Sequence, residues 1–123
     1  MITMVSIFRV QDTAATERRG YSARYYADIK FEEELDTAGF IHVNVPAGTC
    51  TEPHAHEKLE ELFVALTRVK AIVNGTHFYL ESGDLLVVMP NEFHSLEAPE
   101  SEDAILVAIK FPNLKSDKIR NKH

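Results

Sequence analysis

The sequence predicts an all-β protein: a closed double sheet of the jelly-roll type, built from about 8–11 short strands. Three observations support this fold class. Short apolar runs alternate with turn residues every 8–12 positions, and several of them are rich in β-branched residues. Few windows show a helical period. The hydrophobic fraction of 45% in 123 residues is enough for one buried core.

The individual strands follow from alternation and turn signals. Residues 40–45 alternate apolar and polar side chains, which predicts a strand. The apolar runs 61–66 and 104–111 predict two further strands. Asn74-Gly75 between the runs 69–73 and 76–80 is the strongest hairpin signal in the chain. The nearly continuous apolar run 85–89 predicts a strand buried on both faces. We also expect a strand around 21–29, one helical turn within 12–19, and a short helix or a frayed end at 114–123.

Composition and charge exclude several classes of partner. The 13 basic and 19 acidic side chains give a net charge of −6, which disfavours nucleic acid and anionic membranes. No window approaches the ~18 apolar residues of a membrane span, and the N-terminus lacks the pattern of a signal peptide. The single Cys50 excludes an internal disulfide. We therefore expect a cytoplasmic protein with one domain over 1–123, a barrel core at about 38–111 and a charged tail at 114–123.

Histidines and carboxylates gather between residues 48 and 61. In an extended chain His54 and His56 project to the same face, so two imidazoles can bind one divalent cation. A carboxylate on the next strand can add an oxygen ligand. His94 follows a buried strand and the turn 90–92, and can complete the set. The alternative is a pair of surface or hydrogen-bonded imidazoles.

This spacing resembles the two motifs of the cupin superfamily. The first motif has Gly, five residues, His-x-His, three or four residues and then Glu, and Gly48, His54, His56 and Glu61 fit it. The second motif begins at Gly83 and ends eleven positions later in a histidine, here His94. The resemblance covers roughly residues 40–111. It implies a cupin jelly-roll barrel, also called a double-stranded β-helix.

Three residues depart from the family pattern. Arg68 stands where the first motif ends in Gly, and Met89 stands at the family's Pro. Asn91 stands at the second Gly of the second motif. Because Asn is the residue other than Gly that best tolerates a left-handed backbone, we expect this last exchange to be mild.

The resemblance implies one divalent transition metal held by His54, His56, Glu61 and His94. Zn, Fe, Mn, Ni and Cu are all compatible with three imidazoles and one carboxylate. Glu60 competes with Glu61 because it has the strand parity of the two histidines. A turn between them breaks that parity, so we follow the motif count, and Glu60 is then expected to be an outward, solvated charge.

For function, the resemblance implies a metal-dependent enzyme of the isomerase or dioxygenase type that acts on a small polar molecule. It also implies a homodimer, which is common among short cupins. Two alternatives stay open. One is a cupin that binds a small molecule or sugar without turnover. The other is a metal-independent enzyme using His54 and His56, because residues 54–60 are similar to a segment of the nucleotide-sugar 3,4-ketoisomerases.

The remaining candidates have simpler interpretations. We expect Cys50 to be a small buried hydrophobe rather than a thiol near the metal. His42 is expected at the surface rather than as an acid or base at the barrel mouth. His77 in the hairpin is expected to face solvent, and His123 lies at the end of the chain. The basic residues of the tail at 114–123 are expected to be solvated.

Overall fold

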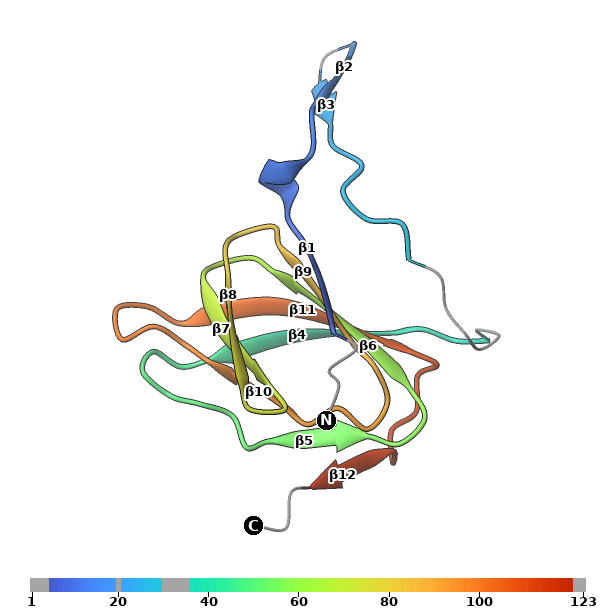
Figure 1. The fold of residues 1–123 in the computed structure, drawn as a ribbon, viewed down its shortest axis with the longest axis vertical. Coiled ribbons are helices and arrows are strands. Elements are labelled where there is room, and N and C mark those ends of the chain that lie inside the picture. The colour runs from blue at the N-terminus through green and yellow to red at the C-terminus, as the bar shows by residue number, and fades with distance from the viewer. Residues whose placement is uncertain (1–4, 20, 30–35, 121–123) are drawn as a thin grey trace.

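The computed structural model describes residues 5–19, 21–29 and 36–120 (Figure 1). Within these residues the protein is all-β, as predicted, with one short 3₁₀ turn, η1 (Val10–Asp12). The first sheet has the order β1 (Ser6–Phe8), β9 (Leu85–Val88), β6 (Glu60–Ala65), β11 (Ala104–Phe111) and β4 (Gly39–Val45). The second has the order β12 (Lys118–Arg120), β5 (His54–His56), β10 (His94–Glu97), β7 (Val69–Val73) and β8 (Thr76–Leu80). All neighbouring strands are antiparallel.

The main core fills the space between the two sheets. Alternate residues of each strand point inward, as the two-residue period of a strand requires. In β11 the inward residues Ala104, Leu106 and Ala108 are buried. They join apolar side chains from both sheets, among them Phe63 and Leu96, in one buried cluster.

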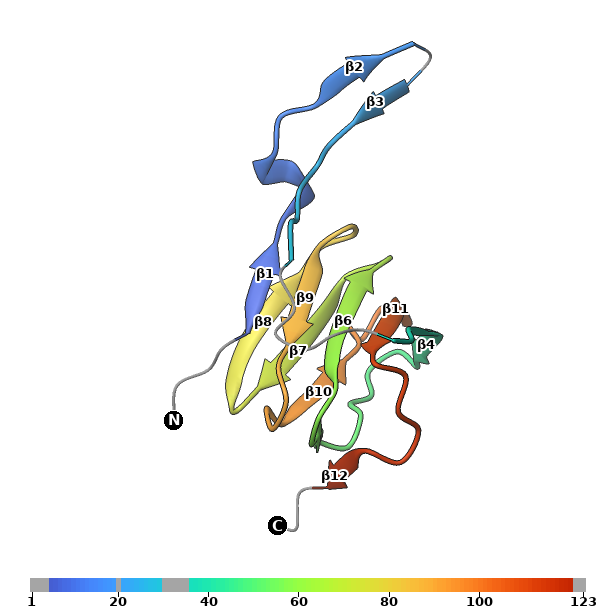
Figure 2. The ribbon, with the colours of Figure 1, turned by 90° about the vertical axis from the view of Figure 1, so that its right-hand side faces the viewer.

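A second apolar cluster covers the outer face of the first sheet. Leu62, Leu85 and Val87 are buried there. Phe8 and Ile29, from the N-terminal segment, pack against this cluster. All four residues of β9 are therefore buried, which confirms the predicted strand covered on both faces. Beyond this contact, the hairpin of β2 (Thr16–Arg18) and β3 (Tyr21–Ala23) projects away from the barrel (Figure 2).

Two turns adopt the conformation that the sequence predicts. Asn74 and Gly75 have φ of 48° and 82°, the left-handed pair of a type I′ hairpin. Asn91 has φ of 67°, so this residue does take the left-handed conformation of the family's Gly.

The N-terminal and C-terminal expectations are partly wrong. The helical turn lies at η1, and residues 16–18 form β2 instead of continuing it. The predicted strand at 21–29 is regular only over β3. Residues 114–120 of the tail are not helical: β12 pairs with β5, because the free edge of β5 offers backbone hydrogen bonds to an extended segment. In the part of the chain that is described, no helix has the length and hydropathy of a membrane span.

Candidate metal centre

Three strands bring the four predicted ligands together inside the barrel. β5 carries His54 and His56, β10 carries His94 directly opposite His54, and β6 carries Glu61 from the other sheet. One ligand atom from each residue lies within 4.8 Å of the others. Ligands bound at about 2.1 Å to one ion lie at most about 4.2 Å apart, so a contraction of about half an ångström would close the set around a cation.

The Glu61 carboxylate is the hub of this cluster. Its Oε1 lies 3.0 Å from Nε2 of His56 and 3.2 Å from Nε2 of His94. The ring centroids of His54 and His94 are 4.5 Å apart. The side chains of Glu61, His56 and His94 are buried, and His54 is half-buried at the open side. Three nitrogens and one oxygen thus converge on a site shielded from bulk water.

Backbone carbonyls orient two of the three imidazoles. Nδ1 of His94 lies 3.0 Å from the Glu92 carbonyl oxygen, and Nδ1 of His54 lies 3.2 Å from that of Glu52. A carbonyl oxygen only accepts, so each Nδ1 carries the hydrogen and donates it. In the neutral ring the Nε2 atom then presents a lone pair, as in metal-binding histidines that are oriented by a second partner.

Two buried nitrogens are left without a hydrogen bond among the described residues, and they are the test of whether a cation fits. His94 Nε2 lies 3.2 Å from Glu61 Oε1, but it has no well-formed hydrogen bond among the described residues. His56 Nδ1 is also unpartnered. Buried polar atoms without partners are rare and unfavourable, by about 1–3 kcal/mol each. A divalent cation between the four side chains would give His94 Nε2 a partner beside the Glu61 carboxylate, so the residues fit a metal.

In the metal-free cluster, the pKa shifts of His54 and Glu61 favour the protonation states in which these side chains bind metals. Burial, followed by the neighbouring His94, lowers the pKa of His54 to about 4, so its ring is neutral at pH 7. For Glu61, burial alone would raise the pKa. The hydrogen bond from His56 and the proximity of His94 outweigh burial and lower the pKa to about 2. A neutral imidazole and an ionised carboxylate are the forms that bind metals.

Comparison with known proteins identifies the family to which this fold belongs. The cupin domain family matches residues 41–110. The chain belongs to the cupin superfamily. No curated protein matches the sequence.

Solved structures share the cupin fold at low sequence identity. A cupin protein from Bacteroides fragilis is 18% identical, with a TM-score of 0.59 over 77% of this chain and 91% of that one. A double-stranded β-helix protein from Klebsiella pneumoniae is 16% identical, with a TM-score of 0.64 over 75% and 81%. The DMSP lyase DddQ from Ruegeria pomeroyi is 18% identical, with a TM-score of 0.62 over 70% of this chain and 44% of the lyase. At these identities the similarity establishes the fold alone.

The turns around the cupin site are tied down by side chains from distant segments. Asp117 in the tail accepts hydrogen bonds from the backbone N–H groups of Lys58 and Leu59, between β5 and β6. Asn74 of the hairpin accepts one from the Phe93 N–H, next to His94. Since both contacts fix the chain within three residues of a candidate ligand, they position the ligands.

Two expectations about nearby residues are wrong. Glu60 does face away from the histidines, but it is 5% exposed and not solvated, and it lines a hollow with Phe8 and Ile29 of the N-terminal segment. Cys50 is exposed rather than buried. Its backbone forms an isolated β-bridge with Glu97, outside the named strands. His42 and His77 are exposed, as predicted, and His123 lies outside the described residues.

The sequence analysis did not identify two residues at the site, Lys110 and Lys118. A cavity of about 160 Å³ opens beside the cluster, lined by His54, Glu61 and His94, by apolar side chains, and by Lys110 and Lys118. The sequence could have predicted the inward position of Lys110, because it alternates in step with the inward residues Ala104, Leu106 and Ala108 of its strand. It could not have predicted the position of Lys118, because the pairing of β12 with β5 joins segments about 60 residues apart.

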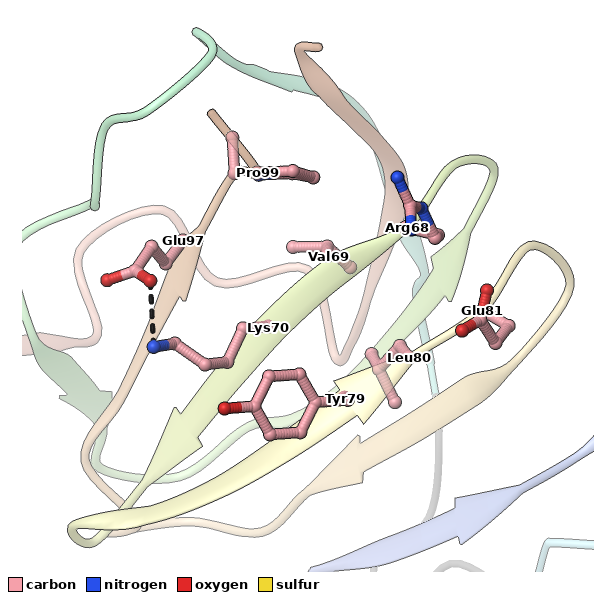
Figure 3. A pocket seen from close by; sticks show the side chains of 9 residues that line it. Arg68, Val69, Lys70, Tyr79, Leu80, Glu81, Glu97 and Pro99 are labelled. Carbon is pink, nitrogen blue, oxygen red and sulfur yellow. Dashed lines mark ion pairs between the residues drawn. The ribbon is translucent and has the colours of Figure 1, made fainter. Parts of the chain in front are cut away.

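A larger hollow, of about 220 Å³, lies on the outer face of β7, β8 and β10 (Figure 3). Both of its basic side chains are paired. Lys70 Nζ lies 2.7 Å from Glu97 Oε2, a contact that raises the pKa of Lys70. The Arg68 guanidinium lies 3.8 Å from Glu102. None of the candidate ligands lines this hollow.

Proposed function

We propose that the protein binds one divalent transition metal through His54, His56, Glu61 and His94, and that it is a metal-dependent enzyme acting on a small polar molecule. One observation supports this most directly. Three imidazoles and a carboxylate converge in a buried site, and His94 Nε2 there faces a carboxylate oxygen without a hydrogen bond. Zn, Fe, Mn, Ni and Cu all suit this donor set.

When bound, such a metal supplies Lewis acidity or a site for activating an oxygen ligand. The protein's own residues provide the surroundings. Glu52 and Glu92 hold two imidazoles in the ligating tautomer through their carbonyl oxygens. Phe63, whose ring lies 5.6 Å from that of His94, helps to exclude water from the inner side. The adjoining cavity leaves room for a small molecule next to the ligands.

The test is metal analysis of the full chain purified without a histidine tag. We expect close to one equivalent of a transition metal, and a loss of most of it in His94→Ala. His42→Ala is the matched control, because this histidine is exposed on the outer face of β4. Less than about 0.1 equivalent in the wild type, with none regained on incubation with any of the five metals, contradicts the proposal.

The metal-independent alternative makes the opposite prediction. His54 and His56 would act as acid and base on a nucleotide-linked ketosugar, and turnover would survive chelation. The third imidazole counts against it, because the His94 ring lies 4.5 Å from that of His54 and its Nδ1, like that of His54, lies within hydrogen-bond distance of a backbone carbonyl oxygen. Turnover of a dTDP-ketosugar by chelated protein would favour this alternative.

A further inference from the structure

The cavity beside the candidate ligands has an unusual lining for a protein with a net charge of −6. Its walls are apolar, formed by Ile41, Val43, Phe63, Leu96 and Ala108. Apart from the ligands, its charged side chains are Lys110 and Lys118, and no Asp or Glu other than Glu61 lines it.

Lys110 is placed at the cavity by the register of the first sheet. It lies opposite Glu61 on β6 and opposite Gly39 on β4, so its side chain starts on the inward face of the barrel. It is half-buried. Within the described residues, Lys110 has no ion pair, although Glu61 is its neighbour across the strands. Glu61 is turned toward the histidines instead.

Lys118 approaches from the other sheet. It lies opposite His56 in the pairing of β12 with β5, and its charge helps to lower the pKa of His54. Its neighbour Arg120 pairs with Glu52, 3.5 Å away. Among the described residues, Lys118 has no such partner. The two lysines therefore reach one cavity from two sheets, and both lack a counterion.

Two lysines outweigh the single carboxylate of the site, and a divalent cation would add two further positive charges. Lys110 is half-buried and Lys118 is exposed, and both line the same cavity, so their positive charges attract an anion to it. The missing negative charge is therefore expected on the ligand. The apolar walls and the volume of about 160 Å³ limit that ligand to a small molecule with an apolar body.

We propose that the site takes a small organic carboxylate with a branched or aromatic body and a second oxygen donor beside the carboxyl group, such as a 2-hydroxy acid. Lys110 and Lys118 bind the carboxylate, the second oxygen faces the metal ligands, and the apolar walls contact the body. This assignment rests on the proposed function for the role of the second oxygen, but the two lysines recognise the carboxylate with or without a metal.

The experiment compares each acid with its uncharged amide by calorimetric titration of the full chain, both metal-loaded and metal-free. The probes are 2-hydroxy-3-methylbutanoate and mandelate. We expect the wild type to bind at least one acid about ten-fold or more tightly than its amide, in keeping with a charged hydrogen bond. Lys110→Met and Lys118→Met each reduce this ratio toward one, and Lys110→Arg restores part of it.

Lys115→Met is the matched control, because Lys115 is exposed on the same tail and does not line the cavity. It keeps the ratio of the wild type. The metal content of every variant is measured in parallel, so that failure of the metal site is seen separately from failure of the lysines. Equal binding of acids and amides, an unchanged ratio in both Lys→Met variants, or tighter binding of inorganic phosphate than of either acid overturns the assignment.

Discussion

The cavity beside the candidate ligands and the hollow over β7 and β8 differ in the partners of their polar side chains more than in their size. The hollow over β7 and β8 is the larger, at about 220 Å³ against 160 Å³. Its Lys70 is nevertheless paired with Glu97. In the inner cavity Lys110 and Lys118 are unpaired and His94 Nε2 has no hydrogen bond among the described residues. Between these two hollows, volume does not identify the candidate site, whereas unsatisfied polar groups do.

The physical cost of the two arrangements explains the difference. An ion pair at the surface is screened by water and is worth little, so Lys70 and Glu97 need no further purpose. Inside the barrel, a buried polar atom that lacks a partner, such as His94 Nε2, is unfavourable by about 1–3 kcal/mol. Such an arrangement is retained where a ligand completes it, and perturbed ionisable groups of this kind gather at functional sites.

The assignment of Glu61 as the metal ligand is tested most sharply by substituting Glu61 and its neighbour Glu60 separately. Glu61→Gln removes the carboxylate at the hub of the cluster, and we expect metal affinity to fall by about 100-fold or more, beyond the usual loss for an outer-shell change. Glu60→Gln alters the outward residue next to it and keeps the metal. Competition with a chromogenic chelator measures both affinities. Equal losses in the two variants would mean that the wrong carboxylate has been assigned.

The rise in Tm on metal loading tests whether His94, and not Lys70 of the hollow over β7 and β8, belongs to the metal site. A free metal concentration of about 100 times Kd stabilises the folded state by about 2.7 kcal/mol, which corresponds to a rise in Tm of roughly 10 °C for a chain of this size. We expect the rise in the wild type and in Lys70→Met, and its absence in His94→Ala. Differential scanning calorimetry of the metal-free and loaded forms measures it. A full rise in His94→Ala would contradict the ligand set.

Acid should lower the stability of the folded, metal-free protein through His54 and not through Lys70. The pKa of His54 is lowered to about 4 in the folded, metal-free protein, against about 6.5 when unfolded. Between these values the unfolded chain binds a proton that the folded chain does not, so stability falls as pH drops from 6.5 toward 4.

Lys70, whose pKa is raised, contributes stability that is lost only as pH rises through and above 10.5, so it adds nothing in the acidic window. Urea unfolding of metal-free protein at pH 7, 6 and 5 checks both statements. Over this range the stability of His54→Asn should decline less steeply than that of the wild type, whereas Lys70→Met should follow the wild type. Parallel declines in all three would show that His54 does not carry the effect.

The smallest effect is expected at the outer hollow itself. Lys70→Met breaks an exposed ion pair with Glu97, and surface pairs contribute little to stability. Metal content, acid binding and the urea midpoint should all stay close to those of the wild type. If Lys70→Met weakened carboxylate binding as strongly as Lys110→Met, the outer hollow would have to be considered a second binding site.

The sequence was most informative where function depends on local spacing. His54 and His56 share a face because alternate residues of a strand do, and Asn91 adopts the left-handed backbone that its motif position requires. It was least informative where distant segments meet. Glu60 is buried beside a hollow that N-terminal residues also line, and the pairing of β12 brings Lys118 close to the histidines; neither arrangement leaves a local pattern. The homodimer, the cytoplasmic location and the single domain stay predictions.

The central claim is that a metal lies between β5, β6 and β10. The most direct measurement is a crystal structure of the protein as purified, with diffraction recorded on both sides of the absorption edges of Mn, Fe, Ni, Cu and Zn. We predict one anomalous peak, at about 2.0–2.3 Å from nitrogens of His54, His56 and His94 and from a Glu61 oxygen. A site without an anomalous peak, in protein grown and purified with these metals present, would contradict the account.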